Sequence, residues 1–504
     1  MATVKISQLP PATGALSSTD VVAAVQSGTT VKATVGSFGY QPAGTGAVAT
    51  TIQAKLRQTV SVKDFGAVGD GTTNDTAALQ AAINASTGGV LYFPAGVYLC
   101  STLSLVANLT IIGAGQNNTI IRSNGTNVGS FIVGISTSNV TVQDLQIDFA
   151  DISSVSATSA FGFLNSNFVA IRNCKIVKFN KLGVAFNSCR YFWIQDCYIE
   201  RTTPDAQGVN ECILTTETGS QTNQYGWIQN NVCVNSGTLL QGSYLFIDNN
   251  TISNWRYGAG IGIAQTASTQ YNIVSGNHIF GNYTGVDSDG FSVKGIECWG
   301  ISNRICNNII HGASGPGIFL GGISSVVEGN IIYDNNTYTA ETPSGGITLA
   351  YVSATYNANN SVVVGNRCFD NVGASGTQQY GITVGASVSN AYIGVNNLDG
   401  NKTGQILNLS TSANSYIGPS YGATATATLG TIANGASNSV SVTIPNAVFG
   451  NIVTASCSID LQGMTISGYV NAANNVIVVV TNNTGSSKTL GSGVFRAVAS
   501  STLV

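Results

Sequence analysis

A short run of the chain, GIECW at 295–299, holds two side chains that together have the chemistry to act on a sugar. Apolar residues alternate along it, so a β-strand here turns Ile296 and Cys298 inward and presents Glu297 and Trp299 outward together. An indole ring stacks on a pyranose face, while a carboxyl group exchanges a proton with the glycosidic oxygen. We therefore predict Glu297 as a catalytic acid and Trp299 as a sugar-binding residue.

Hydrolysis of a glycosidic bond needs a second carboxyl group, roughly 5 to 9.5 Å from the first. The candidates for this second carboxyl are Asp289, Asp287 and Glu211. Further candidate substrate contacts in the insertion 278–307 are Tyr283, His278 and Lys294. The competing interpretation is that the acidic pair caps a loop, or that Glu297 only bonds to the backbone.

A polysaccharide lyase would use a base and a cation near a uronate carboxylate instead. The cations that could serve are Lys294, Arg256 and Arg304. Because the acidic and aromatic signal is stronger than the basic one, the sequence favours a glycoside hydrolase over a lyase.

These residues belong to a repeat that runs from 139 to 399. Each copy consists of an apolar residue, two polar or small residues, an Asn or Cys, any residue, and a second apolar residue. The fourth position of the copies falls at Leu145, Cys174, Cys197, Asn231, Asn250, Asn277, Asn308, Asn330, Asn366 and Asn396. A period of about 20 to 50 residues indicates a solenoid or a propeller. A second phrase, a Gly followed by an apolar residue, precedes most copies, so each repeat holds at least two short strands. Since the hairpin signals of propeller blades are missing, we predict a right-handed parallel β-helix.

Stacked coils place equivalent residues in columns about 4.8 Å apart. The asparagines from Asn231 onward predict a ladder in which each amide bonds to its neighbours. Two residues later lies an apolar column: Ile147, Ile176, Ile199, Cys233, Ile252, Ile279, Ile310, Ile332, Cys368 and Leu398. Cysteines on these columns are expected to be buried and reduced. With no CxxC pair and only two histidines, we expect no metal site and no cofactor.

The composition is unusual for a folded chain of 504 residues. Only 8% of the residues are charged while 43% are hydrophobic, so the protein folds and its polar surface must be mostly uncharged. Such a surface suits contact with sugars and argues against nucleic acid. No run of about 18 apolar residues is present and the start lacks the apolar core of a signal peptide, so neither membrane insertion nor export by that route is expected.

The N-terminal run KISQLPPATGALSSTDVVAAVQSG resembles the attachment segments of bacteriophage tail fibres and tailspikes. The resemblance implies that residues 1–40 bind a phage tail or baseplate protein; a small independent β domain is the alternative. Residues 41–59 follow as a short helical neck. Val48, Ile52 and Leu56 form one apolar stripe over three helical turns, which favours packing on copies of itself in a homotrimer.

Residues 60–99, VSVKDFGAVGDGTTNDTAALQAAINASTGGVLYFPAGVYL, resemble the opening of the pectate-lyase-like β-helix family of phage tailspikes and polysaccharide-degrading enzymes. The resemblance assigns the Asp and Gly residues of this motif to structure. Asn74 or Asp75 is placed to cap a helix over 75–85, which would close the end of the solenoid and cover its first strand edge. We expect the solenoid to span 60–415.

Tight alternation of Ala or Val with Thr or Ser predicts an antiparallel β-sandwich over 416–504, used for trimerisation or for glycan binding. Together these features predict a phage tailspike that recognises and depolymerises a bacterial surface polysaccharide such as capsule, exopolysaccharide or lipopolysaccharide O-chain. It would be part of the virion tail and assemble in the host cytoplasm. The alternatives are a non-catalytic adhesin or tail appendage on the same scaffold, and a cellular polysaccharide enzyme, against which the first 57 residues argue.

Overall fold

Most strands of the computed structural model are parallel. The structure describes residues 19–126, 128–149, 156–179, 181–202, 211–218, 222–264, 266, 268–281, 283–338, 344–411, 416–417, 421–444 and 447–500. In these ranges the parallel strands form three long sheets of 14, 12 and 12 strands, which we call sheets 1, 2 and 3. This is the parallel β-helix that the repeat predicts. The chain divides into two compact units, residues 1–245 and 246–504. The attachment motif KISQLPP lies outside the described residues.

Each coil of the first unit contributes one short strand to sheets 1 and 2, and every coil after the first also contributes one to sheet 3. Sheet 1 holds β5 (Thr59–Ser61), β7 (Val90–Phe93), β10 (Leu109–Gly113), β13 (Ser138–Gln143), β16 (Asn167–Arg172), β19 (Arg190–Gln195) and β22 (Gln224–Gln229). Sheet 2 holds β6 (Asp70–Asn74), β8 (Gly96–Cys100), β11 (Thr119–Ser123), β14 (Gln146–Asp148), β17 (Lys175–Phe179), β20 (Tyr198–Arg201) and β23 (Val232–Val234). Sheet 3 holds β9 (Leu103–Ser104), β12 (Val128–Ile135), β15 (Ser156–Leu164), β18 (Leu182–Asn187), β21 (Ile213–Thr216) and β24 (Thr238–Leu240). The register aligns Ile147, Ile176 and Ile199, so the predicted apolar column is confirmed here.

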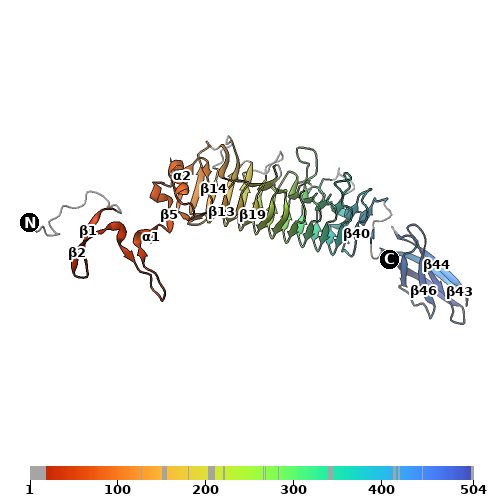
Figure 1. The fold of residues 1–504 in the computed structure, drawn as a ribbon. Helices are drawn as coiled ribbons and strands as arrows, with labels where there is room; N and C mark the ends of the chain where they lie inside the picture. The colour runs from red at the N-terminus through yellow and green to blue at the C-terminus, as the bar shows by residue number, and fades with distance from the viewer. Residues whose placement is uncertain are drawn as a thin grey trace, which may run out of the picture. The chain divides into compact units, whose positions relative to one another are not determined.

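Helix α2 (Thr76–Ala85) lies at the end of the coil stack that begins with β5 (Figure 1). It buries Leu79 and Ile83 completely. The Gln80 amide accepts a hydrogen bond from Ser104 N at 2.9 Å and donates one to Ser104 O at 2.8 Å. Because Ser104 belongs to β9, the first strand of sheet 3, the helix satisfies the open edge of that sheet as expected.

The two candidate caps of α2 have different roles. Asn74 Oδ1 accepts from Thr76 N at 3.1 Å, at the first turn of the helix. The Asp75 side chain does not cap the helix; its carboxylate accepts from Val68 N at 2.6 Å and Gly69 N at 2.9 Å. Asp75 therefore holds the preceding turn.

The residues before the solenoid form two small antiparallel pairs, β1 (Val21–Gln26) with β2 (Thr29–Thr34) and β3 (Gly39–Tyr40) with β4 (Thr50–Thr51). The predicted neck helix is shorter than expected: α1 covers only Ile52–Leu56. Thr51 is the reason, because it pairs in β4 and its hydroxyl then caps Ala54 N at 3.0 Å. No helix in the described part of the chain is long and apolar enough to cross a membrane.

In the second unit most strands of sheets 1 and 2 are only three residues long. After β25 (Ser243–Asp248), which begins in the first unit, sheet 1 holds β28 (Ile273–Ser275), β31 (Arg304–Cys306), β34 (Val326–Glu328), β37 (Val362–Val364), β40 (Tyr392–Ile393) and β42 (Tyr416–Ile417). Sheet 2 holds β26 (Thr251–Ser253), β29 (His278–Phe280), β32 (Ile309–His311), β35 (Ile331–Tyr333) and β38 (Arg367–Phe369). Sheet 3 holds β27 (Ala259–Ile263), β30 (Lys294–Cys298), β33 (Ile318–Leu320), β36 (Gly345–Leu349), β39 (Tyr380–Val384) and β41 (Gly404–Asn408).

The predicted asparagine ladder runs through this unit. Each Nδ2 donates to the Oδ1 of the next asparagine at 2.9 to 3.0 Å, through Asn250, Asn277, Asn308, Asn330, Asn366 and Asn396. The same Oδ1 atoms accept backbone N–H groups, for example Asn277 N at 2.9 Å from Asn308 Oδ1. The ladder therefore satisfies the buried turn between sheets 1 and 2.

The recurring Gly of the second phrase has a steric cause. It is the second residue of a strand of sheet 3, or directly precedes the strand, at the corner where that strand meets the apolar column of sheet 2. A Cβ on Gly260 would lie 2.6 Å from Ile279 Cγ2, closer than carbon atoms can approach. Only glycine therefore lets the two sheets meet at this corner.

The C-terminal residues form two antiparallel three-stranded sheets, as predicted. One has the order β43 (Tyr421–Ile432), β48 (Lys488–Ser500), β45 (Ile452–Cys457) and the other β44 (Ser437–Thr443), β47 (Asn475–Thr481), β46 (Thr465–Ala472). Val442, Val478 and Phe495 are fully buried in their shared core. The predicted antiparallel β-sandwich is therefore confirmed.

Candidate functional site

A pocket of about 480 Å³ opens on the outward face of sheet 3 in the second unit. Its lining comes from three successive coils, through β30, β33 and β36 and the loops beside them. The lining residues are Phe291, Lys294, Glu297, Trp299, Pro316, Phe319, Ser344, Thr348 and Val352. A volume of roughly 300 to 1,000 Å³ is typical of sites for small molecules, so the pocket has room for a sugar unit.

Strand alternation places Glu297 in this pocket as predicted. Ile296 and Cys298 are fully buried, while Glu297 lies between them on the opposite side of the strand. The register aligns Glu297 with Gly262 in the coil before and with Phe319 in the coil after. Because Gly262 has no side chain, the carboxylate is not crowded from that side.

Lys294 reaches the same pocket because the alternation is broken at Gly295. A Cβ on Gly295 would collide with Ile310, so residue 295 faces the core and cannot carry a side chain. The break lets Lys294 turn toward Glu297, with Lys294 Nζ 3.6 Å from Glu297 Oε1 and the two side chains 11% and 21% exposed. The pair is largely shielded from water, so it interacts more strongly than a surface pair.

Aromatic rings surround the ammonium group. Lys294 Nζ lies 5.7 Å from the ring centroids of both Phe291 and Phe319. Trp299 packs against Phe319 with centroids 5.1 Å apart and planes tilted by 54°. Gly321 makes room for the indole, because a Cβ there would overlap the Trp299 ring. The pocket therefore combines one ion pair with apolar faces suited to the C–H side of a sugar ring.

Neighbouring groups fix the backbone of β30. The buried Trp255 donates its indole N–H to the Lys294 carbonyl at 3.0 Å. Burial raises the pKa of the Cys298 thiol to about 12, so it stays protonated and serves as an apolar core group rather than a nucleophile. Among the described lining residues only Lys294 and Glu297 are ionisable.

The structure does not bring the predicted second carboxyls into the pocket. Asp287 is buried, and its Oδ1 accepts from Asp289 N at 3.1 Å and Phe291 N at 3.0 Å. Asp289 accepts from the Tyr257 hydroxyl at 2.6 Å. These contacts correspond to the loop-capping interpretation: Asp287 positions the loop that carries Phe291.

Three other candidates are also not among the described lining residues. The Tyr283 hydroxyl donates to Val286 O at 2.7 Å, within the loop and not in the pocket lining. His278 belongs to β29 of sheet 2, a different face of the coil. Glu211 is a buried side chain of the first unit, next to β21. A role for it beside Glu297 remains a prediction.

Several pocket residues were missed from the sequence, although a signal for them was present. In each copy of the Gly-apolar phrase, the next residue faces outward at the same level of sheet 3. Reading that position gives Glu297, then Phe319, then Thr348, which the register aligns in one column. Pro316, Ser344 and Val352 come from loops, whose paths the repeat does not define.

Comparison with known proteins shows which folds and sequences the chain is similar to. Residues 59–287 match the family model described as Rhamnogalacturonase A/epimerase, pectate lyase-like. Mannuronan C5-epimerase AlgE3 of Azotobacter vinelandii is 41% identical over 105 residues, which span 18% of this chain and 6% of the epimerase. Depolymerase 1, capsule K30/K69-specific, of Klebsiella phage K5-2 is 33% identical over 152 residues, 26% of this chain and 19% of that protein. The matches thus span a fifth or less of these relatives.

A solved tailspike shares the architecture over nearly the whole chain. The tailspike protein of E. coli bacteriophage HK620, solved as a mutant in complex with pentasaccharide, aligns with a TM-score of 0.53 at 16% identity. The alignment covers 93% of this chain and 98% of that one. At this identity the likeness establishes the fold, the pectate-lyase-like parallel β-helix that phage tailspikes also have.

Proposed function

On the premise of this tailspike-type β-helix, we propose that the protein binds a bacterial surface polysaccharide in the pocket of Lys294, Glu297 and Trp299 and cleaves it during phage attachment. The observation that carries the proposal is a shielded carboxylate at the centre of an aromatic, sugar-sized pocket on the outward face of the solenoid. The capsule-specific phage depolymerase that matches part of the chain supports the same class of substrate.

In hydrolysis, Glu297 donates its proton to the glycosidic oxygen as the bond from the anomeric carbon to that oxygen breaks, and water adds to the anomeric carbon. No second carboxylate is among the described lining residues, so this water gives its proton to solvent. Lys294, whose Nζ lies 3.6 Å from Glu297 Oε1, would bind a hydroxyl or an anionic group of the sugar.

Elimination is the second candidate, favoured by the presence of one ammonium and one carboxylate instead of two carboxylates. Lys294 would pair with the carboxylate of a uronate unit. Glu297 would remove the C5 proton, the C5–H electrons would form the C4–C5 double bond, and the C4–O bond would break with protonation of the leaving oxygen. Both routes use the same two residues, but they leave different products.

The test is to incubate the purified full-length protein with a panel of bacterial capsules, exopolysaccharides and O-chains. Hydrolysis yields new reducing ends without ultraviolet absorbance, whereas elimination yields both reducing ends and the absorbance of an unsaturated uronate. Retention of glycan without new ends would show a non-catalytic adhesin. The absence of binding and cleavage with every glycan, including that of the bacterium from which the phage is isolated, would refute the proposal.

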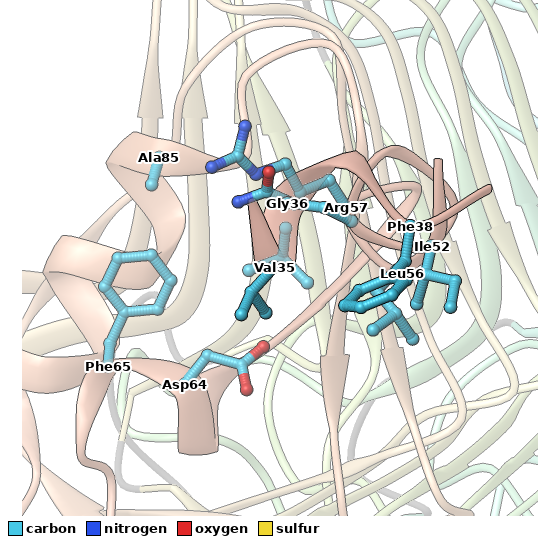
Figure 2. Close-up of a pocket in the computed structure, with 11 residues that line it drawn as sticks. Val35, Gly36, Phe38, Ile52, Leu56, Arg57, Asp64, Phe65 and Ala85 are labelled. Atoms are coloured by element: carbon cyan, nitrogen blue, oxygen red, sulfur yellow. The ribbon is translucent and has the colours of Figure 1, made fainter. Parts of the chain in front are cut away.

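We also propose that residues 1–40 attach the protein to a phage tail or baseplate protein and that it acts in the virion as a homotrimer, assembled in the host cytoplasm. Two exposed apolar side chains support trimerisation. Leu56 of α1 is 71% exposed, and Val48, which precedes the helix, is 79% exposed. Ile52 and Leu56 line an apolar cavity of about 770 Å³ in the first unit with Phe38 and Phe65 (Figure 2). A five-residue helix gains stability only by packing on other surfaces. Sedimentation of a stable monomer would contradict this arrangement.

A further inference from the structure

The two histidines of the chain lie side by side on the outward face of sheet 2. His278 is the first residue of β29 and His311 the last of β32, in the next coil. The register pairs His278 with Ile309 and Phe280 with His311, so the histidines are diagonal neighbours across two adjacent strands. Their Nε2 atoms are 3.3 Å apart.

This separation corresponds to two nitrogen ligands that share one metal ion. Zinc binds imidazole nitrogen at about 2.0 to 2.1 Å with tetrahedral angles, which places two such nitrogens roughly 3.3 to 3.4 Å from each other. A direct N–H to N hydrogen bond between the two rings is the competing arrangement at the same distance.

Both rings are held in place before any ion arrives. His311 is stacked between Phe280, at 5.7 Å and 12°, and Tyr333, at 4.6 Å and 14°. His278 packs on Phe280 with centroids 4.8 Å apart and is itself exposed. Rigid strands and stacked rings reduce the entropy lost when the two nitrogens are fixed on one ion.

We propose that His278 and His311 form a binding site for a late first-row divalent ion such as Zn²⁺, Ni²⁺ or Cu²⁺. Among the described residues no group of three or more His, Cys, Asp or Glu side chains is placed to hold an ion, so water or a ligand from outside the chain completes the coordination. Imidazole nitrogen suits these ions, and Cu²⁺ should bind more tightly than Zn²⁺.

Such an ion would join consecutive coils. It links residues that are 33 apart in sequence, and it binds the folded chain alone because the two nitrogens meet only there. Metal should therefore raise the unfolding temperature of the solenoid, whatever the protein does to glycans.

The test is calorimetric titration of the full-length protein, purified with a histidine-free tag, with Zn²⁺ at pH 7.5. We expect one ion per chain, at least tenfold weaker binding for His278→Asn and for His311→Asn, and no binding for the double variant. Ile331→Thr, on the same face with an exposed side chain that cannot bind metal, is the matched control and should bind as the wild type does. Equal binding by the double variant would overturn the proposal.

Proton NMR of the wild type provides a readout that needs no substitution. The chain has two histidines, so its imidazole C–H signals report on this site alone. Both sets should shift together and saturate at one equivalent of Zn²⁺. Signals that do not move at millimolar Zn²⁺ would instead identify the pair as a hydrogen bond, and the metal site would be rejected.

Discussion

Replacement of Glu297 by Gln tests the proposed chemistry most directly. The substitution keeps the shape of the side chain and removes its ability to carry a proton. Its neighbours Ile296 and Cys298 face the core, so the change on the outward side leaves the packing of the strand intact. The substitution places a neutral amide where the carboxylate now lies 3.6 Å from Lys294 Nζ.

The expected loss of catalytic rate is larger than the expected loss of folding stability. Proton transfer by a placed carboxyl contributes about 10² to 10⁴ in rate, or ~2.7 to 5.5 kcal/mol at 1.36 kcal/mol per tenfold. The structural effect is smaller, because Lys294 loses an ion-pair partner at 3.6 Å but no hydrogen bond, and it keeps the faces of two aromatic rings. We therefore expect turnover to fall at least a hundredfold in a protein that remains folded.

The assay is the initial rate of release of new chain ends from the cleaved glycan, with glycan retention and thermal unfolding measured in parallel. Glu328→Gln is the matched control, because Glu328 pairs with Arg304 and lies outside the pocket lining. It should cleave at the wild-type rate. A Glu297→Gln variant with unchanged turnover would refute the reasoning, and one that loses its thermal transition would show Glu297 to be structural.

Three further outcomes are expected. Trp299→Ala should weaken glycan retention about tenfold by removing a stacking surface, and Gly321→Ala should do so partly, because its Cβ displaces the indole; binding and tryptophan fluorescence check both. Asn308→Ala should destabilise the fold by roughly 1 to 3 kcal/mol, since it leaves the buried Asn277 N–H without its acceptor; a thermal transition at the wild-type temperature would contradict this. Burial raises the pKa of Cys189 to about 11, so a thiol reagent at pH 8 should leave it unmodified until denaturant is added, and rapid modification of the native protein, located by mass spectrometry, would show otherwise.

The repeat by itself determined the solenoid. Its spacing predicts the asparagine ladder and the apolar column, both of which depend only on equivalent residues stacking from coil to coil. Alternation within one strand was enough to turn Glu297 outward, because residues two apart in a strand share a face. These are local or periodic properties, which a sequence states directly.

Side chains that depart from the repeat pattern are positioned by tertiary packing. Lys294 lies beside Glu297 only because Gly295 meets Ile310 of another strand and breaks the alternation. Asp75 and Asp287 have the spacing of a helix cap and of a catalytic partner, yet each carboxylate bonds to backbone N–H groups of a folded turn. A carboxylate takes whichever donors the fold brings nearest, and the sequence does not state those distances.

Neighbours across coils depended on the structure as well. The sequence does not bring His278 near His311 or Glu297 near Phe319, because the number of residues between adjacent coils varies with each loop. Stacking of the strands fixes a rung spacing of about 4.8 Å regardless of loop length, so residues 33 apart meet as closely as residues 22 apart. The columns were therefore readable from the sequence, while the pairs that make a site were decided by the register of the sheets.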